Sequence, residues 1–393
     1  MKRWFLIILS IAMLLPFMSC QFPEWSYRLI DGGAEITSYF GASKELNIPS
    51  KIDGHSIISI GEQAFAYNKG IQSVKIPNSV LTIEKSAFLY CSNLKKLEIG
   101  NQVKSIKSSA FQECSGIREL ALPASLEEIG TAAFAYVLLE KIIVDSKNPH
   151  FVSEDNILYD KEKTTVILYP QGKGDSCQIK DTVTTIGDYA FAGINDLKKI
   201  SFTEKVINIG SFAFSGCNNL DTIAFPLSLQ HIGDFALNGT AWLKQQNDEY
   251  LILNNRFFLA YTGTSPRLEM PEGVISVTHQ QSLEIENPVR ILKLPDSVKE
   301  ISTVFLEYYN FSLFEIDEKN RIFTTDSTVL YNYNKSELIK YSSKNHNDVF
   351  DVPQTTKKIS DYAFAHCYNL KEINLPNGIM EIGEYAFKTA GLK

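Results

Sequence analysis

The hexapeptide Ile-Gly-Glu-Gln-Ala-Phe at residues 60–65 returns, slightly altered, every 23 residues along this chain. The next copy, at residues 83–88, reads Ile-Glu-Lys-Ser-Ala-Phe. Eight of the nine copies keep Ala-Phe at the same two places, and the ninth has Ala236-Leu237. The copies begin at Ile60, Ile83, Ile106, Ile129, Ile186, Ile209, Ile232, Ile359 and Ile382. A fixed period of this length indicates a stack of repeated structural units.

Each unit also contains spaced leucines, as at Leu94, Leu97 and Ile99. Apolar and polar residues alternate at the end of this stretch, which predicts a short strand with one buried face. A proline follows the strand in several units, and proline cannot donate a hydrogen bond to a ladder. The Ala-Phe pair fits a tight turn on the opposite side of the coil. We therefore predict a β-rich repeat solenoid with short turns and short helical segments.

Stacking places each side chain above its equivalent in the next coil, so the phenylalanines should form one buried column. Its predicted members are Phe65, Phe88, Phe111, Phe134, Phe191, Phe214, Phe364 and Phe387. Cys91, Cys114, Cys217 and Cys367 all lie nine places into their units. We interpret them as small buried thiols with weak hydrogen bonds. A disulfide between Cys91 and Cys114 is the alternative, although parallel inward side chains rarely reach the required dihedral angle.

Composition excludes several classes of protein. The 393 residues are 44% hydrophobic, which excludes wholesale disorder, and the net charge of −7 argues against a nucleic-acid partner. No phosphate loop, nucleophile motif or paired metal-ligand spacing occurs, so we predict no catalytic, cofactor or metal site. His366 beside Cys367 could form a Cys/His pair, but a cysteine repeated as scaffold is a poor nucleophile. Asp155 and Asp326 could bind calcium, but solvated carboxylates are the favoured interpretation because calcium needs six or more oxygens.

The first twenty residues predict export from the cell. Lys2 and Arg3 precede an apolar run from Trp4 to Phe17, which fits a secretory signal peptide and is too short to span a membrane. Ser19 directly before Cys20 resembles a bacterial lipobox, in which the cysteine is acylated and the chain is cut before it. Residues 1–19 are then a lipoprotein signal peptide and Cys20 the lipidation site. Ordinary cleavage near Ser19, leaving Cys20 as a thiol, is the alternative.

Two long intervals between repeats contain the same insertion, because residues 145–170 align with residues 317–341. Both predict β-hairpins, and residues 250–261 resemble them. The hairpin insertions are placed at about 145–180, 244–275 and 317–352. Their tyrosines form a candidate binding surface consisting of Tyr159, Tyr169, Tyr331, Tyr333 and Tyr341. Aromatic residues are enriched at binding hot spots, but hairpin tyrosines equally often cover the core beneath them. The outward strand positions mix charge signs and hold no aromatic ladder.

The repeat unit resembles the BspA-like, treponemal type of leucine-rich repeat found in surface lipoproteins. The resemblance implies a right-handed superhelix of 23-residue coils with inserted hairpins. Residues 27–65 are similar to the opening segment of that family, so residues 20–59 are expected to be an N-terminal cap. Residues 60–393 then form the leucine-rich repeat domain. A solenoid needs such a cap because its terminal coil otherwise exposes apolar surface.

Two functions remain open. The resemblance implies a lipid-anchored surface protein of the bacterial envelope, on the outer membrane surface, that binds host extracellular matrix or another cell-surface protein. The alternative is an inward-facing envelope scaffold or a solute-binding accessory lipoprotein. Both place the chain at the membrane through its lipid, and neither involves nucleic acid or an enzymatic reaction.

Overall fold

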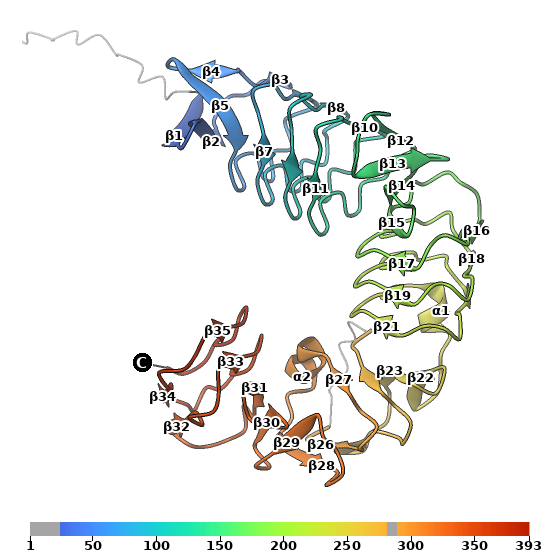
Figure 1. Ribbon diagram of the computed structural model, residues 1–393, viewed down its shortest axis with the longest axis vertical. Helices are drawn as coiled ribbons and strands as arrows, with labels where there is room; N and C mark the ends of the chain where they lie inside the picture. Colours follow the sequence, from blue (N-terminus) through green and yellow to red (C-terminus); the bar gives the residue numbers. More distant parts are fainter. Residues whose placement is uncertain (1–23, 281–288, 393) are drawn as a thin grey trace, which may run out of the picture.

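The computed structural model describes residues 24–280 and 289–392, which form a curved stack of coils (Figure 1). Two ladders of short parallel strands follow the stack, one on its outer, convex side and one nearer its inner, concave side. Regular neighbours are offset by one repeat, so that Ile83 lies opposite Ile106. The predicted β-rich solenoid of 23-residue coils is therefore confirmed.

The inner ladder consists of four segments in the described chain. The first contains β2 (Gly33–Tyr39), β5 (His55–Ile60), β7 (Thr82–Ile83), β9 (Ser105–Ile106) and β11 (Glu128–Ile129). The second contains β15 (Thr165–Leu168), β17 (Thr185–Ile186), β19 (Asn208–Ile209) and β21 (His231–Ile232). The third contains β23 (Phe257–Tyr261), β25 (Ser276–Val277) and β27 (Glu300–Ile301), and the fourth β31 (Glu337–Tyr341), β33 (Lys358–Ile359) and β35 (Glu381–Ile382). We call the junctions after β11, β21 and β27 the first, second and third seams.

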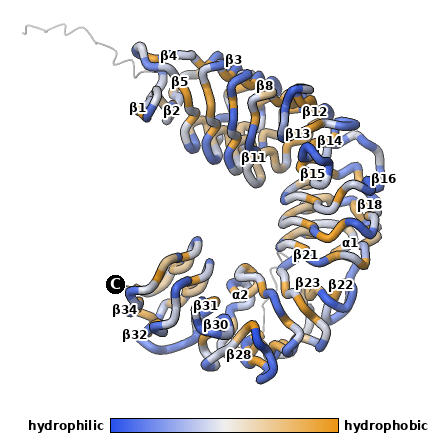
Figure 2. Tube along the Cα trace, in the orientation of Figure 1, coloured by the Kyte–Doolittle hydropathy of each residue, from blue (hydrophilic) through white to orange (hydrophobic). Residues whose placement is uncertain are grey.

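The outer ladder contains three-residue and four-residue strands, which correspond to the leucine-spaced stretches of the sequence. They are β3 (Glu45–Asn47), β6 (Ser73–Lys75), β8 (Lys96–Glu98), β10 (Glu119–Leu122), β12 (Lys141–Val144), β16 (Ser176–Gln178), β18 (Lys199–Ser201), β20 (Thr222–Ala224), β24 (Arg267–Glu269), β26 (Ile291–Leu294), β28 (Leu313–Ile316), β32 (Val349–Asp351) and β34 (Glu372–Asn374). Along each coil hydrophilic and hydrophobic stretches alternate (Figure 2), because only one face of each strand is turned to the core.

An antiparallel hairpin begins the stack. Strand β1 (Trp25–Ile30) pairs with β2, and the short β4 (Lys51–Ile52) pairs with β5. Trp25 packs on Tyr39 at a ring-centroid distance of 4.7 Å and meets the Phe65 ring edge-on at 6.2 Å. These side chains cover the apolar end of the first coil.

Each Ala-Phe motif forms consecutive tight turns directly after an inner strand. In the first coil, Ala64 N–H donates to the Gly61 carbonyl at 3.2 Å, and Ala66 N–H donates to the Gln63 carbonyl at 3.0 Å. Each coil with an Ala-Phe or Ala-Leu motif places two residues in the left-handed region, as at Gln63 (φ 56°) and Tyr67 (φ 61°). Such φ values are rare for residues other than glycine.

The phenylalanines form the predicted column. Phe65, Phe88, Phe111 and Phe134 stack nearly parallel, with successive centroid distances of 4.7, 5.1 and 5.5 Å. Similar contacts join Phe191 to Phe214 at 5.0 Å, and Phe364 to Phe387 at 5.4 Å. The alanine that precedes each phenylalanine is buried as well, as at Ala87 and Ala110.

The repeated cysteines are free, buried thiols, as the favoured interpretation predicted. Cys91 Sγ donates to the Phe65 carbonyl at 3.1 Å, and Cys114 Sγ donates to the Phe88 carbonyl at the same distance. Burial raises the pKa of Cys217 to about 12. No disulfide joins the cysteines of the described chain.

The insertions add antiparallel strands and then return to the inner ladder. Strands β13 (Phe151–Glu154), β14 (Ile157–Asp160) and β15 form one antiparallel sheet, and β15 continues into parallel pairing with β17. The later insertion repeats this order with β29 (Phe323–Thr325), β30 (Val329–Asn332) and β31, while β22 (Tyr250–Leu253) pairs with β23. Each predicted hairpin therefore exists, and its last strand belongs to the solenoid.

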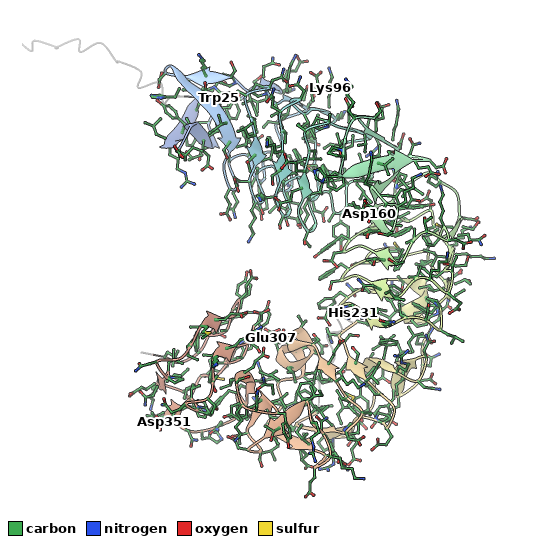
Figure 3. The ribbon with its side chains drawn as sticks, in the orientation of Figure 1. Trp25, Lys96, Asp160, His231, Glu307 and Asp351 are labelled. Carbon is green, nitrogen blue, oxygen red and sulfur yellow. The ribbon has the colours of Figure 1, made fainter. Side chains whose placement is uncertain are left out.

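Two short helices occur within residues 24–280 and 289–392. Helix α1 (Ala241–Lys244) follows the coil that starts at Ile232, and α2 (Thr303–Tyr309) replaces the Ala-Phe turn after Ile301. Ser302 caps α2, since its hydroxyl accepts from Phe305 N–H at 3.1 Å. The Glu307 carboxylate of this helix accepts from His366 Nε2 at 3.2 Å and from Lys388 Nζ at 3.0 Å. Helix α2 thus ties the last coils to the stack on its inner side, where Figure 3 labels Glu307.

Candidate binding surface

The outer strands present a polar, charge-compensated surface. Lys96 pairs with Glu98 at 2.7 Å, and Lys75 approaches the same carboxylate at 3.7 Å. Arg267 pairs with Glu269 at 2.6 Å. Exposed ion pairs of this kind contribute little free energy. These ion-paired side chains of the outer face therefore offer little net charge for recognition.

The expectation that the hairpin tyrosines are exposed is wrong for four of the five. Tyr159, Tyr169, Tyr331 and Tyr341 are at most 5% exposed, and only Tyr333, at 51%, faces solvent. Tyr169 directly follows β15 and Tyr341 ends β31, so their rings begin the next stretches of the phenylalanine column. Tyr169 lies 4.4 Å from Phe191, and Tyr341 lies 5.4 Å from Phe364.

Exposed and half-exposed aromatic side chains gather instead on the turns that follow the inner strands. Tyr189 stacks on Phe212 at 4.7 Å, and Phe212 stacks on Phe235 at 4.9 Å. The Tyr136 ring meets Tyr189 edge-on at 6.2 Å, and His279 continues the series at 5.1 Å from Phe235. The ring of Tyr308, in helix α2, lies 4.2 Å from that of His279. We call Tyr136, Tyr189, Phe212, Phe235, His279 and Tyr308 the aromatic row. Shorter stacks join Tyr67 to Tyr90 and Tyr362 to Tyr385.

The aromatic row is half-buried, except for His279, which is only 4% exposed. Partial burial raises the pKa of Tyr189 to about 12, so its hydroxyl stays neutral at physiological pH. The Tyr136 hydroxyl reaches across the first seam and donates to Ser215 Oγ at 3.0 Å. Its ring passes so close to Gly193 (φ 80°) that a Cβ there would lie 3.2 Å from it. Glycine at this position therefore allows both the left-handed backbone and the approach of the ring.

Sequence reasoning missed the aromatic row because it examined only the outward positions of the predicted strands. The available signal was the residue immediately before Ala-Phe or Ala-Leu. That residue is Gln63, Ser86, Ser109 and Ala132 in the first four units, and then Tyr189, Phe212 and Phe235. All seven have left-handed φ values between 55° and 59°. The repeated backbone therefore holds these side chains in one line.

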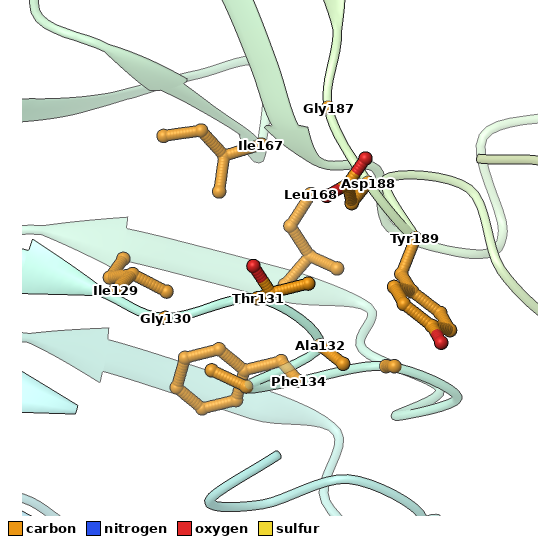
Figure 4. Close-up of a pocket in the computed structure, with 12 residues that line it drawn as sticks. Ile129, Gly130, Thr131, Ala132, Phe134, Ile167, Leu168, Gly187, Asp188 and Tyr189 are labelled. Atoms are coloured by element: carbon orange, nitrogen blue, oxygen red, sulfur yellow. The ribbon is translucent and has the colours of Figure 1, made fainter. Parts of the chain in front are cut away.

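A pocket of about 170 Å³ opens at the first seam. The turn from Ile129 to Ala135 forms one side, and Ile167, Leu168 and the segment 187–189 form the other (Figure 4). Tyr189 of the aromatic row stands at its edge. The phenylalanine column is interrupted here, because no described ring lies in contact between Phe134 and Tyr169.

The other candidate groups have structural partners. His366 Nε2 faces Glu307, and Cys367 Sγ faces the Tyr341 carbonyl at 3.9 Å, so these neighbours do not form a Cys/His pair. Asp155 pairs with Lys180 at 3.0 Å, and Asp326 Oδ1 accepts from Val329 N–H at 2.9 Å. Within residues 24–280 and 289–392, no three metal-ligating side chains converge.

The predicted lipidation site, Cys20, lies outside the described residues. In the part of the chain that the structure covers, no helix is long and apolar enough to span a lipid bilayer.

Several solved structures share similarity with the chain. A leucine-rich cell surface protein from Faecalibacterium prausnitzii is 19% identical, with a TM-score of 0.31 over 75% of this chain and 93% of that one. The pneumococcal vaccine antigen PcpA is 18% identical, with a TM-score of 0.43 over 75% and 96%. A leucine-rich repeat protein from Bacteroides ovatus is 19% identical, with a TM-score of 0.39 over 93% and 91%. No curated protein matches the chain significantly.

The sequence also matches a family model directly. Six copies of the BspA type leucine rich repeat region cover residues 38–160, 169–250 and 341–393. The matched segments contain all nine Ala-Phe or Ala-Leu units and together make up more than half of the chain. This chain therefore belongs to the BspA-type leucine-rich repeat family, whose members are bacterial surface proteins.

Proposed function

We propose that this protein is exported, anchored to the bacterial surface through a lipid on Cys20, and binds protein partners through its aromatic row. The row itself carries the proposal: its side chains stand on the turns of neighbouring coils and, for Tyr308, on helix α2. Stacked rings have already lost most of their rotational freedom, so a partner that packs on them pays little additional ordering entropy. Tyrosine and tryptophan are also enriched among the few residues that carry most of the binding energy at protein interfaces.

The family and the N-terminal sequence support the location. BspA-type repeats occur in bacterial surface proteins, and residues 1–20 have the charge, apolar length and Ser19-Cys20 pair of a lipoprotein signal. Two or three acyl chains anchor a protein stably, because membrane affinity grows by about 0.8 kcal/mol for each buried methylene. The partner is a host matrix glycoprotein or a protein on a neighbouring cell.

Protease treatment of intact cells tests the location. We expect added protease to remove the protein from intact cells and the Cys20→Ala variant to be lost from the membrane fraction. An unrelated periplasmic protein should survive until the cells are lysed. If this chain also survives until lysis, the surface proposal fails and the inward-facing scaffold becomes the better explanation.

Replacing Phe212 by serine tests the row. Serine stands at the same left-handed position in the coils of Ser86 and Ser109, so the backbone accepts it. We expect binding to immobilised matrix glycoproteins or to neighbouring bacterial cells to weaken at least tenfold, because an aromatic anchor is lost. Surface plasmon resonance on the purified protein gives the affinity, and circular dichroism confirms that the coil stays folded.

Tyr385→Ser is the matched control, because Tyr385 occupies the same place in the last described coil, stacks only on Tyr362 and lies outside the row. It should bind like the natural chain. Equal binding by the Phe212→Ser variant would exclude the row as the recognition surface.

A further inference from the structure

Adjacent coils of the solenoid are joined by a repeated set of three backbone hydrogen bonds between their Ala-Phe turns. Between the first two coils, Gln63, Phe65 and Tyr67 donate to the carbonyls of Lys85, Ala87 and Leu89, at 3.2, 2.8 and 2.7 Å. The same three bonds recur at every regular junction of the inner ladder. The donors at these junctions are Ser86, Phe88, Tyr90, Ser109, Phe111, Glu113, Tyr189, Phe191, Gly193, Phe212, Phe214, Gly216, Tyr362, Phe364 and His366.

At the first seam these three hydrogen bonds are absent from the described chain. The equivalent donors are the N–H groups of Ala132, Phe134 and Tyr136, and none of them has an acceptor within residues 24–280 and 289–392. On the facing coil, the Asp188 and Ala192 carbonyls likewise have no donor in the described chain. Phe134 is buried, whereas Ala132 and Tyr136 are partly exposed. A buried backbone group is almost always paired, because leaving it without a hydrogen bond costs about 1–3 kcal/mol. The open donors border the pocket between the two coils.

The second seam shows what can satisfy such donors. There Phe235 N–H donates to the His279 carbonyl at 2.6 Å, and Leu237 N–H donates to Gln280 Oε1 at 3.0 Å. Gln280 Nε2 donates in turn to the Gly233 carbonyl at 2.8 Å. Phe235, Leu237 and Gly233 correspond in the repeat to Ala132, Phe134 and Gly130 of the first seam. The chain therefore fills one seam with a two-residue segment, His279-Gln280, whereas at the other seam the equivalent N–H groups of Ala132 and Phe134 have no acceptor in the described chain.

We propose that the pocket at the first seam binds a short extended segment of a protein partner that carries an aromatic or imidazole side chain followed by glutamine. A backbone carbonyl of the segment accepts from Ala132 N–H. The glutamine amide accepts from Phe134 N–H and donates to the Gly130 carbonyl. The preceding ring lies over the small Ala132 side chain beside Tyr189, as the His279 ring lies against Phe235.

This site is distinct from the exposed faces of the aromatic row, although it adjoins one end of it. The inference rests on the proposed function only for the class of ligand, a protein segment. Binding of a peptide to the purified chain is independent of where the protein lies on the cell.

Hydrogen exchange on the mature full-length chain tests the proposal. The probe is a synthetic peptide that copies residues 276–282, Ser-Val-Thr-His-Gln-Gln-Ser. We expect the amides of Ala132, Phe134 and Tyr136 to exchange quickly in the free protein and at least tenfold more slowly with saturating peptide. The amides of Ser109, Phe111 and Glu113 are already bonded to the next coil and serve as internal references. A peptide with alanine at the Gln280 position should give much weaker protection.

Two matched variants test whether the peptide protects these amides by binding at the first seam. Ala132→Phe fills the pocket, and the fold tolerates phenylalanine at this left-handed position, as at Phe212 and Phe235. Ser109→Phe makes the same change one coil earlier, where the junction is closed. We expect the first to abolish protection by the peptide and the second to leave it unchanged. Slow exchange of the three amides in the free protein, no change with peptide, or equal protection in the Ala132→Phe variant would each overturn the proposal.

Discussion

Replacing Phe111 by alanine is expected to lower the free energy of unfolding by about 3–5 kcal/mol. The Phe111 side chain is fully buried and stacks between Phe88 and Phe134, at 5.1 and 5.5 Å. The deletion removes the transfer free energy of the ring and leaves a cavity that the hydrogen bonds between neighbouring turns prevent from closing. In a solenoid each coil is stabilised mainly by its neighbours, so the loss affects both adjacent interfaces.

Urea titration followed by circular dichroism measures this loss. Tyr67→Ala is the control, since it removes an aromatic ring from a turn of the same kind where 61% of the residue is exposed. It should cost less than about 1 kcal/mol. A comparable small loss for Phe111→Ala would mean that the column does not support the stack.

The regular coils could be predicted because a strict repeat fixes many contacts at once. When Phe88 and Phe111 are 23 residues apart in identical contexts, stacking alone places one ring on the other. The thiols of Cys91 and Cys114 can be placed for the same reason. The sequence spacing thus determined the column and the buried cysteines without knowledge of any coordinate.

The tyrosines of the insertions were placed wrongly because their strands have no repeat to fix the register. A shift of one residue moves every side chain of a strand to the opposite face. Only the pairing of β15 with β17 shows that Tyr169 faces the core, and its N–H donates to the Ala190 carbonyl at 2.8 Å as a column phenylalanine would.

The aromatic row and the open seam depend on backbone features that residue types do not reveal. Tyrosine and phenylalanine rarely adopt the left-handed conformation, yet Tyr189 and Phe212 do so because the turn geometry is imposed by neighbouring coils. The missing hydrogen bonds of Ala132 and Phe134 are equally invisible in the sequence, since both residues fit the repeat. Their missing bonds come from how the neighbouring coil lies against them, which the repeat pattern does not show.

The second large effect concerns Lys340, a buried lysine that interrupts an otherwise apolar position. It lies in β31 where the first insertion has Leu168, and only 2% of the residue is exposed. Its Nζ donates to the Tyr362 carbonyl at 2.8 Å. Burial lowers the pKa of Lys340 to about 8, and the positive charge of Lys388 lowers it slightly as well. Cys367 and Glu307 act in the opposite direction and raise this pKa. Because burial disfavours the charged ammonium form, Lys340 destabilises the folded state at every pH at which its side chain is protonated.

The pKa values of Lys340 in the folded and the unfolded chain set the sign of the pH dependence of stability. The unfolded lysine titrates near its ordinary 10.5 and the folded one near 8, so between these values the unfolded chain binds more protons and stability rises with pH. Below pH 8 both states are protonated, and the full cost of about 3 kcal/mol remains. Lys340→Leu, which copies Leu168, should therefore stabilise the protein by about 2–3 kcal/mol at pH 7, after loss of one hydrogen bond. The carbonyl of Tyr362 keeps a partner in Ala365 N–H.

Urea titrations of the natural chain and the Lys340→Leu variant at pH 7 and pH 10.5 test this account, because taking their difference cancels every other titrating group. The stability gained by leucine should fall from about 2–3 kcal/mol at pH 7 to below about 1 kcal/mol at pH 10.5. Lys344→Leu is the control, since this nearby lysine is exposed, and its effect should be small at both pH values. A gain that stays the same at the two pH values would show that leucine acts by packing alone and that Lys340 is not held against its charge.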